Sequence, residues 1–263
     1  MGEPARTESS EELTTDFVHR WVELPNGRME LQEFPLTPEY FLDPQIGDQV
    51  VQSFRHWRVT SRLWEIVYNH AKTVWAEVLV LSDQKLLWGH REWRQPAPDV
   101  AVIPEFPDSE SFEGASFDVA ETGYRPCLII EVVSFSNARI RKTDLVDKVD
   151  LYEREKIREY LALDPPRRSN GHRFQWIGYR LDDQGRYRRI EPDDEGRLHA
   201  ETVGLLFGVS PDGRDFEVFD VRTRERLWTA AETVKEATAA RKAAEAEVAR
   251  LREELARLKR SGD

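Results

Sequence analysis

Residues 128–134 read LIIEVVS, a stretch that decides the fold because apolar residues surround a single carboxylate, Glu131. Short runs of β-branched and aromatic residues, bounded by turn residues, are typical of buried strands. Comparable runs occupy residues 74–81 (VWAEVLVL), 84–90, 98–103 (PDVAVI) and 159–164 (EYLALD). A carboxylate within such a strand is costly to bury alone. Glu131 therefore needs a cation, a proton or a metal ion.

Helical spacing of apolar residues flanks these strands. Residues 51–70 and 144–156 repeat apolar positions every three or four residues, which predicts two helices. The rings of Phe54, Trp57 and Trp64 are expected in the core. Residues 104–126 indicate a long acidic loop, residues 173–181 and 185–190 a hairpin, and residues 216–221 a last strand. The order predicts an α/β layered domain over residues 17–228.

The two ends of the chain differ from this domain. Residues 1–16 are polar and acidic, so we expect disorder, and residues 17–50 predict a proline-broken capping arm. Residues 229–263 predict a C-terminal coiled coil, with a seam at Val234, Ala237, Arg241, Ala244, Val248, Leu251, Leu255 and Leu258. Such a seam needs a partner, most simply another copy in a homodimer or higher homo-oligomer. A solvated single helix is the alternative, because the first half of the seam is weak.

Composition excludes several classes. No run approaches the roughly 20 apolar residues that span a bilayer, and the first residues lack the apolar core of a secretory signal. We therefore expect a cytoplasmic protein without membrane association. One cysteine, Cys127, excludes an internal disulfide. The net charge of −11 argues against a simple nucleic-acid coat. The acidity is uneven, however: residues 1–50 hold eleven acids against three bases, and residues 139–168 hold nine bases against seven acids.

Three residues form the candidate site. Asp99 begins the strand PDVAVI, Glu131 lies inside LIIEVVS, and Lys148 lies on the following helix. Carboxylates on adjacent strands can converge on a hard divalent ion, and a nearby lysine can stabilise charge on a phosphoryl group. The ordinary alternative places Glu131 on a solvated strand face, Asp99 in a turn cap and Lys148 on an exposed helix face. The six histidines show no metal-ligand spacing, so surface or core roles are expected for them.

The motifs of residues 98–166 resemble the Uma2 family of the PD-(D/E)XK restriction-endonuclease-like superfamily. The resemblance rests on Pro98-Asp99, Glu131-Val132-Val133-Ser134, Lys148 with Tyr152, Glu159-Tyr160-Leu161 and Asp164-Pro165, which follow in the family's order. It implies a restriction-endonuclease-like core, a central mixed sheet flanked by helices. Phe135 departs from the proline usual in the family. No extra acidic ligand stands out on the first helix, where Glu65 is only a candidate, as is Glu77 just beyond it.

The resemblance also implies a chemistry. Asp99, Glu131 and the backbone carbonyl of Val132 would bind Mg²⁺ or Mn²⁺, and Lys148 would take the role of the catalytic lysine that Val133 replaces. Ser134 and Tyr152 are possible accessory residues. Arg139, Arg141 and Lys142 could contact phosphates or form a solvated turn. The expected function is metal-dependent endonuclease cleavage of nucleic acid, with DNA favoured as the substrate and RNA left as an open alternative. The alternative is a non-catalytic oligomeric binding or scaffold protein with the same fold and tail.

Overall fold

The centre of the protein is a six-stranded mixed sheet. The computed structural model describes residues 17–35, 37, 39–44, 49–50, 53–90, 94–107, 109–133, 141–166 and 173–261. The sheet has the order β11-β10-β9-β8-β6-β4, in which β8 and β9 run parallel and the other neighbours antiparallel. Its strands are β4 (Val78–Leu81), β6 (Val100–Pro104), β8 (Leu128–Val132), β9 (Glu159–Asp164), β10 (Gln175–Leu181) and β11 (Tyr187–Arg189). The mixed sheet expected from the sequence is confirmed.

The strands β4, β6, β8 and β9 are buried on both faces of the sheet, which explains why they are apolar without alternation. Alternate residues of each strand enter two separate cores. In β8, Leu128, Ile130 and Val132 enter the first core, and Ile129 enters the second together with Val133. Glu131 has the same parity as Ile129 and therefore points to the second face.

The first core lies between the sheet and helix α2 (Phe54–Val74). Ser53 caps α2 by accepting a hydrogen bond from the backbone N–H of His56. A second sheet of β12 (Leu198–Ala200), β13 (Leu205–Val209) and β14 (Phe216–Asp220) completes this core, and only β14 was expected. The expected burial of the aromatic face is wrong for two rings, since Phe54 is 72% and Trp57 55% exposed. Only Trp64 packs against the core, where its indole donates to the Val80 carbonyl.

The second core lies under the helical segment of η1 (Thr143–Asp147), a π-helical turn, and α5 (Lys148–Arg154). Residues 104–126 are not the plain loop expected, because they form β7 (Ser116–Asp118) and α3 (Val119–Thr122). The predicted strand at 84–90 is shorter, β5 (Lys85–Leu87), and pairs with β7 outside the central sheet. A ring cluster of Phe106, Phe112 and Phe117 fills this side.

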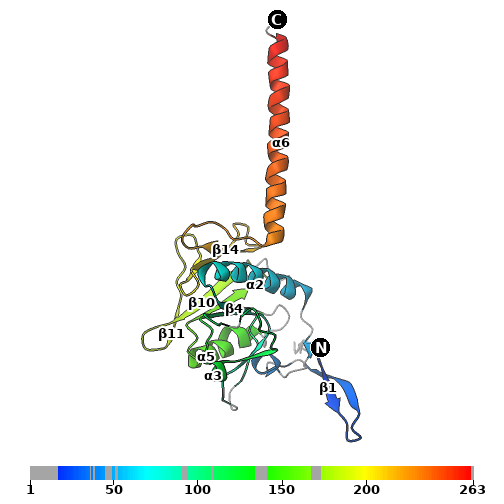
Figure 1. Cartoon of the computed structure of the whole chain (residues 1–263), viewed down its shortest axis with the longest axis vertical. Helices are drawn as coiled ribbons and strands as arrows, with labels where there is room; N and C mark the ends of the chain where they lie inside the picture. Colours follow the sequence, from blue (N-terminus) through cyan, green and yellow to red (C-terminus); the bar gives the residue numbers. More distant parts are fainter. Residues whose placement is uncertain are drawn as a thin grey trace, which may run out of the picture.

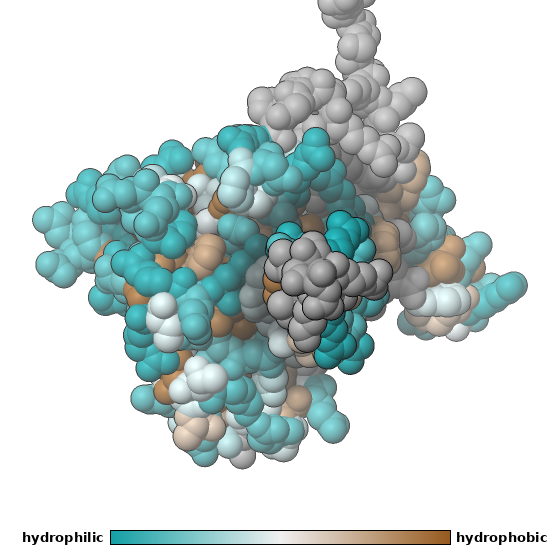
Figure 2. Space-filling view, turned by 90° about the horizontal axis from the view of Figure 1, so that it is seen from above, coloured by the Kyte–Doolittle hydropathy of each residue, from teal (hydrophilic) through white to brown (hydrophobic). Residues whose placement is uncertain are grey.

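Two elements project from the domain (Figure 1). One is an arm of β1 (Phe17–Glu23), β2 (Met29–Pro35) and β3 (Gln49–Val50), with α1 (Glu39–Leu42) after β2. The arm exposes apolar side chains, whereas the surface seen from above in Figure 2 is otherwise mostly hydrophilic. The other is the C-terminal helix α6 (Ala230–Ser261). Within the described residues, no helix has both the length and the apolar character that a bilayer crossing requires. Residues 1–16, where disorder was expected, lie outside the described residues.

Candidate active site

Asp99 and Glu131 meet on one face of the central sheet. β6 and β8 pair antiparallel with Val100 opposite Ile130, and the same register places Asp99 opposite Glu131. Residues directly opposite in such a pair have Cβ atoms about 5 Å apart. Both side chains are at most 5% exposed. The alternative of a solvated strand face is therefore wrong for Glu131.

Lys148 closes the site from the helical side. Its Nζ lies 2.9 Å from Glu131 Oε2 and 3.0 Å from Asp144 Oδ1. Lys148 is 3% exposed, so the alternative of an exposed helix face is also wrong. The Lys148 N–H donates to the carbonyl of Thr143, five residues earlier, which is the hydrogen bond that defines the π-turn. Such turns are rare and occur frequently at functional sites.

Tyr152 fixes the other oxygen of Glu131. Its hydroxyl donates to Glu131 Oε1 at 2.9 Å, and its ring is fully buried. It follows Lys148 by one helical turn, so both side chains reach the sheet from the same helix face. Tyr160, from β9, donates to the backbone carbonyl of Asp144 at 2.5 Å and anchors the π-turn. Both oxygens of Glu131 are thus held from one helix.

Asp99 is held from two other directions. Its Oδ1 lies 3.0 Å from Nε2 of His56, in the first turn of α2. Its Oδ2 accepts the backbone N–H of Val132 at 2.6 Å. The sequence reasoning missed the role of His56, and it also missed Asp144. The i, i+4 spacing of Asp144 and Lys148 on the predicted helix could have identified Asp144. No local pattern in the sequence marks His56.

The sheet ladder ends beside these carboxylates. The Val133 N–H donates to Leu163 of β9, so the N–H and C=O of Val132 point to the opposite neighbour. On that side the ladder with β6 ends at Val100–Ile130, and Pro98 beyond it accepts the Asp83 N–H and has no N–H to donate. The Val132 carbonyl consequently has no ladder donor at position 98, next to Asp99 and Glu131.

Charge in the site is unbalanced. Asp99, Glu131 and Asp144 are three buried carboxylates around one ammonium, Lys148, with His56 at the edge. Burial, together with the nearby charges of Asp99 and Asp144, raises the pKa of Glu131 to about 8 against the attraction of Lys148. Burial opposes ionisation of Asp99 too, but His56 and Lys148 outweigh it and hold its pKa below the usual range. The raised pKa means that the ionised form of Glu131 is disfavoured in this site unless a further positive charge is present.

Lys148 remains charged. Burial alone would lower its pKa, but Asp144, Glu131 and Asp99 together raise that pKa above its usual value. His56 behaves similarly, because burial lowers its pKa and Asp99 more than compensates, leaving the pKa raised. The ammonium of Lys148 is thus a fixed positive charge and is no proton acceptor near neutral pH.

The predicted phosphate contacts lie at the edge of this site. Arg141 forms a bidentate ion pair with Asp164 at the end of β9. Lys142 is exposed, and its Nζ lies 3.1 Å from Asp147. Ser134 and Arg139 lie outside the described residues. Glu65, considered from the sequence as an extra ligand, accepts the N–H of Ala230 and so belongs to the base of α6.

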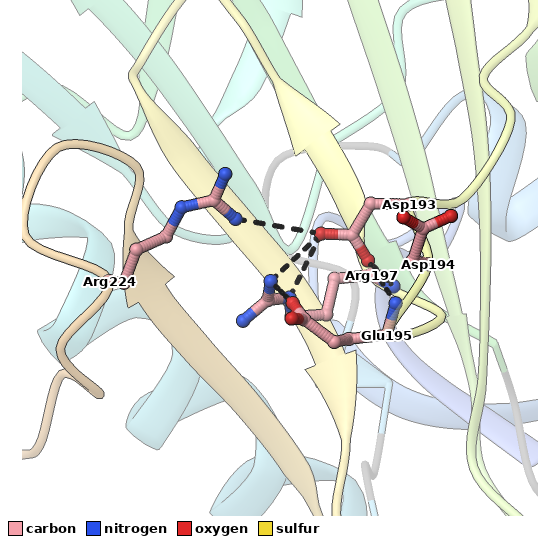
Figure 3. A pocket seen from close by; sticks show the side chains of 5 residues that line it. All are labelled: Asp193, Asp194, Glu195, Arg197 and Arg224. Carbon is pink, nitrogen blue, oxygen red and sulfur yellow. Dashed lines mark hydrogen bonds and ion pairs between the residues drawn. The ribbon is translucent and has the colours of Figure 1, made fainter.

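A surface hollow of about 230 Å³ lies apart from this site, at Asp193, Asp194, Glu195, Arg197 and Arg224 (Figure 3). It adjoins the β12–β14 sheet, on the opposite face of the central sheet from Glu131. Both of its arginines are paired with Asp193, since Arg197 lies 3.0 Å and Arg224 3.7 Å from that carboxylate. The hollow therefore offers a useful comparison for nonspecific cation binding and is not the candidate active site.

The fold and site define an α/β protein with a mixed sheet, consistent with the restriction-endonuclease-like fold. A family model named Uma2, described as "Putative restriction endonuclease", matches residues 28–217. That match covers well over half of the chain, so the protein belongs to the Uma2 family. The matched region ends before α6. A search of curated proteins finds no match.

Proposed function

We propose that the protein is a metal-dependent nuclease that hydrolyses phosphodiester bonds, with DNA as its substrate. The observation that carries this proposal is the buried cluster of three carboxylates, Asp99, Glu131 and Asp144, around one ammonium, Lys148. A buried group of this kind is stabilised by a cation. The family description supports nucleic acid as the substrate.

The donors present suit Mg²⁺ or Mn²⁺. Asp99 and Glu131 would hold the ion with the Val132 carbonyl, and oxygen donors are the ligands that these ions prefer. The absent N–H at Pro98 supports the carbonyl as the third donor. Within the described residues, no three His, Cys, Asp or Glu side chains are arranged to hold a metal ion. The proposed set needs only two such side chains, and water or substrate oxygens would complete it.

The protein's own residues have distinct roles in this proposal. When bound, the ion would supply Lewis-acid stabilisation of a phosphate and lower the pKa of a bound water. Lys148 acts as a fixed positive charge beside the phosphate, and its raised pKa argues against a role as base. Tyr152 orients Glu131, while His56 and the Val132 N–H orient Asp99.

Phosphate contacts outside the site are proposed at the start of the helical segment. Lys142 is the exposed cation there. Its ion pair with Asp147 is solvent-exposed and contributes little free energy, so a phosphate can replace Asp147 at small energetic cost. Arg141 would have to leave its forked pair with Asp164, so we assign it the weaker contribution. Arg139 remains a sequence-based candidate.

Metal binding is the first test. We expect calorimetric titration of Mn²⁺ into the full chain to give one binding event that Asp99→Asn abolishes. Asp194→Asn, which removes a carboxylate from the surface hollow, is the matched control and should leave the heats unchanged. Equal heats in all three proteins would contradict the proposed site. Loss of binding in Asp194→Asn alone would place the cation in the hollow.

Cleavage is the second test. Plasmid DNA, single-stranded DNA and RNA are incubated with each metal ion, and Lys148→Gln serves as the inactive variant. We expect Mn²⁺-dependent DNA cleavage that falls at least about 100-fold in Lys148→Gln, the scale of one lost charge-stabilising group. Calorimetry checks that this variant still binds Mn²⁺. Metal binding without cleavage of any substrate would favour the scaffold alternative.

A further inference from the structure

Helix α6 presents an apolar stripe that no other described residue of the chain covers. It rises from the domain as a single rod (Figure 1), and Val234 is 67% exposed while Val248 and Leu251 are each 45% exposed. Most helical stability in proteins comes from packing an apolar face, so a solvated stripe on a 32-residue helix indicates an interface. The side chains of Leu255 and Leu258 lie outside the described residues.

The base of α6 is firmly attached to the domain. Thr229 and Glu232 form a reciprocal capping box, with hydrogen bonds of 2.9 Å and 3.2 Å between side chain and backbone. From α2, Glu65 accepts the Ala230 N–H at 2.7 Å, and Arg62 lies 2.6 Å from Glu232. The direction of the helix is therefore set by the domain.

The charged residues beside the stripe determine which helix can pair with α6 and whether the two helices run parallel or antiparallel. With Val234, Arg241 and Val248 at a positions, Glu247 occupies a g position and Arg252 the next e position. In a parallel coiled coil, g of one helix faces the following e of its partner, so Glu247 meets the partner's Arg252. The sequence repeats the pattern one heptad later with Glu254 and Lys259. An antiparallel pair would bring g positions together and oppose glutamates.

We propose that α6 binds a second copy of this chain as a parallel, in-register, two-stranded coiled coil. Arg241 weakens the first half of the seam, but Glu245 on the same helix lies 3.5 Å away and offsets its charge. A single polar a position fixes register at some cost in stability. Because both helices leave their domains in the same direction, the two domains lie side by side at one end. This inference does not depend on the nuclease proposal.

A matched pair of cysteine variants tests the orientation. In a Cys127→Ser background, Ala244→Cys places a thiol at d and Ala246→Cys places one at f, on the outer face. We expect mild oxidation to link Ala244→Cys into a disulfide dimer and to leave Ala246→Cys unlinked. A parallel, in-register pair brings position 244 at d beside its own copy and keeps position 246 at f apart from its copy. Equal crosslinking of both variants, or none of Ala244→Cys, would overturn the proposal.

Charge exchange tests the pairing itself. We expect light scattering to show a dimer for the full chain. Glu247→Lys and Arg252→Glu should each weaken it roughly tenfold, since two symmetry-related exposed pairs become repulsive. The double variant Glu247→Lys/Arg252→Glu should restore dimerisation. A monomeric or trimeric full chain would refute the two-stranded pairing. Failure of the double variant to recover would refute the Glu247–Arg252 contact.

Discussion

Replacing Glu131 with glutamine should change how stability depends on pH in the metal-free protein. The pKa of Glu131 is about 8 in the folded protein against an ordinary 4.5, because the carboxylate is buried near Asp99 and Asp144. Each pKa unit corresponds to about 1.4 kcal/mol, so ionising Glu131 in the folded protein costs about 5 kcal/mol. The Glu131→Gln variant would keep the neutral shape of the side chain and remove this titration.

The sign follows from proton binding. Between pH 4.5 and about 8 the folded protein keeps the Glu131 proton that the unfolded chain has released. The unfolding free energy therefore falls as the pH rises through this range, by up to about 1.4 kcal/mol per pH unit, and levels off above it. The same contribution is absent in Glu131→Gln.

Urea unfolding from pH 5 to 8.5 in the presence of a chelator measures this difference. Subtracting the curve of Glu131→Gln from that of the wild type cancels the groups that both proteins share. Glu121→Gln, at an exposed position in α3, is the matched control and should follow the wild type. Excess Mn²⁺ should reduce or reverse the wild-type slope, because a bound cation replaces the proton. Parallel pH profiles of wild type and Glu131→Gln in chelator would refute the reasoning.

Three further predictions concern other contacts. His56→Ala should lower the unfolding free energy by about 1–3 kcal/mol, because it leaves buried Asp99 without one partner. The control His19→Ala, in the arm, should change the unfolding free energy little. Equal effects of the two variants in denaturant unfolding would contradict this prediction. His70 is buried, and burial lowers its pKa. The wild type should therefore lose stability relative to His70→Gln as the pH falls below 6.5, because the unfolded chain binds the proton more readily. Identical unfolding free energies of the two proteins across the acid range would contradict this prediction. Gly178→Ala should lower the unfolding free energy by about 1–3 kcal/mol, because a Cβ would lie 2.7 Å from Leu161 and 3.0 Å from Leu198. An unchanged free energy in denaturant unfolding would show that these two side chains can move aside.

The sequence predicted the central strands of the sheet well because β6, β8 and β9 are buried on both faces. Residues 159–164 were expected as a strand and form β9 with those bounds. Glu131 was recognisable because one charge interrupts an apolar strand. The short strands β12 and β13 were missed, since three to five residues between turns carry little periodic signal.

The candidate site was predicted in part. Asp99, Glu131 and Lys148 stood out by their places in strands and helix, and the structure brings them together. His56 precedes Asp99 by 43 residues and meets it only because α2 packs across the sheet. Phe54 and Trp57 were expected in the core on composition, yet the first turns of α2 extend beyond it. Such placements depend on tertiary packing, which local patterns do not encode.

The fixed root of α6 has a practical consequence. A helix of 32 residues is about 48 Å long, and its first turn is fastened to α2 at Glu65 and Arg62. A fluorophore or affinity tag attached near residue 261 would therefore stand well clear of Glu131 and leave the carboxylates undisturbed. A label at Ala230 or Glu232, in contrast, would disturb the contacts with Glu65 and Arg62 that fasten this helix to α2.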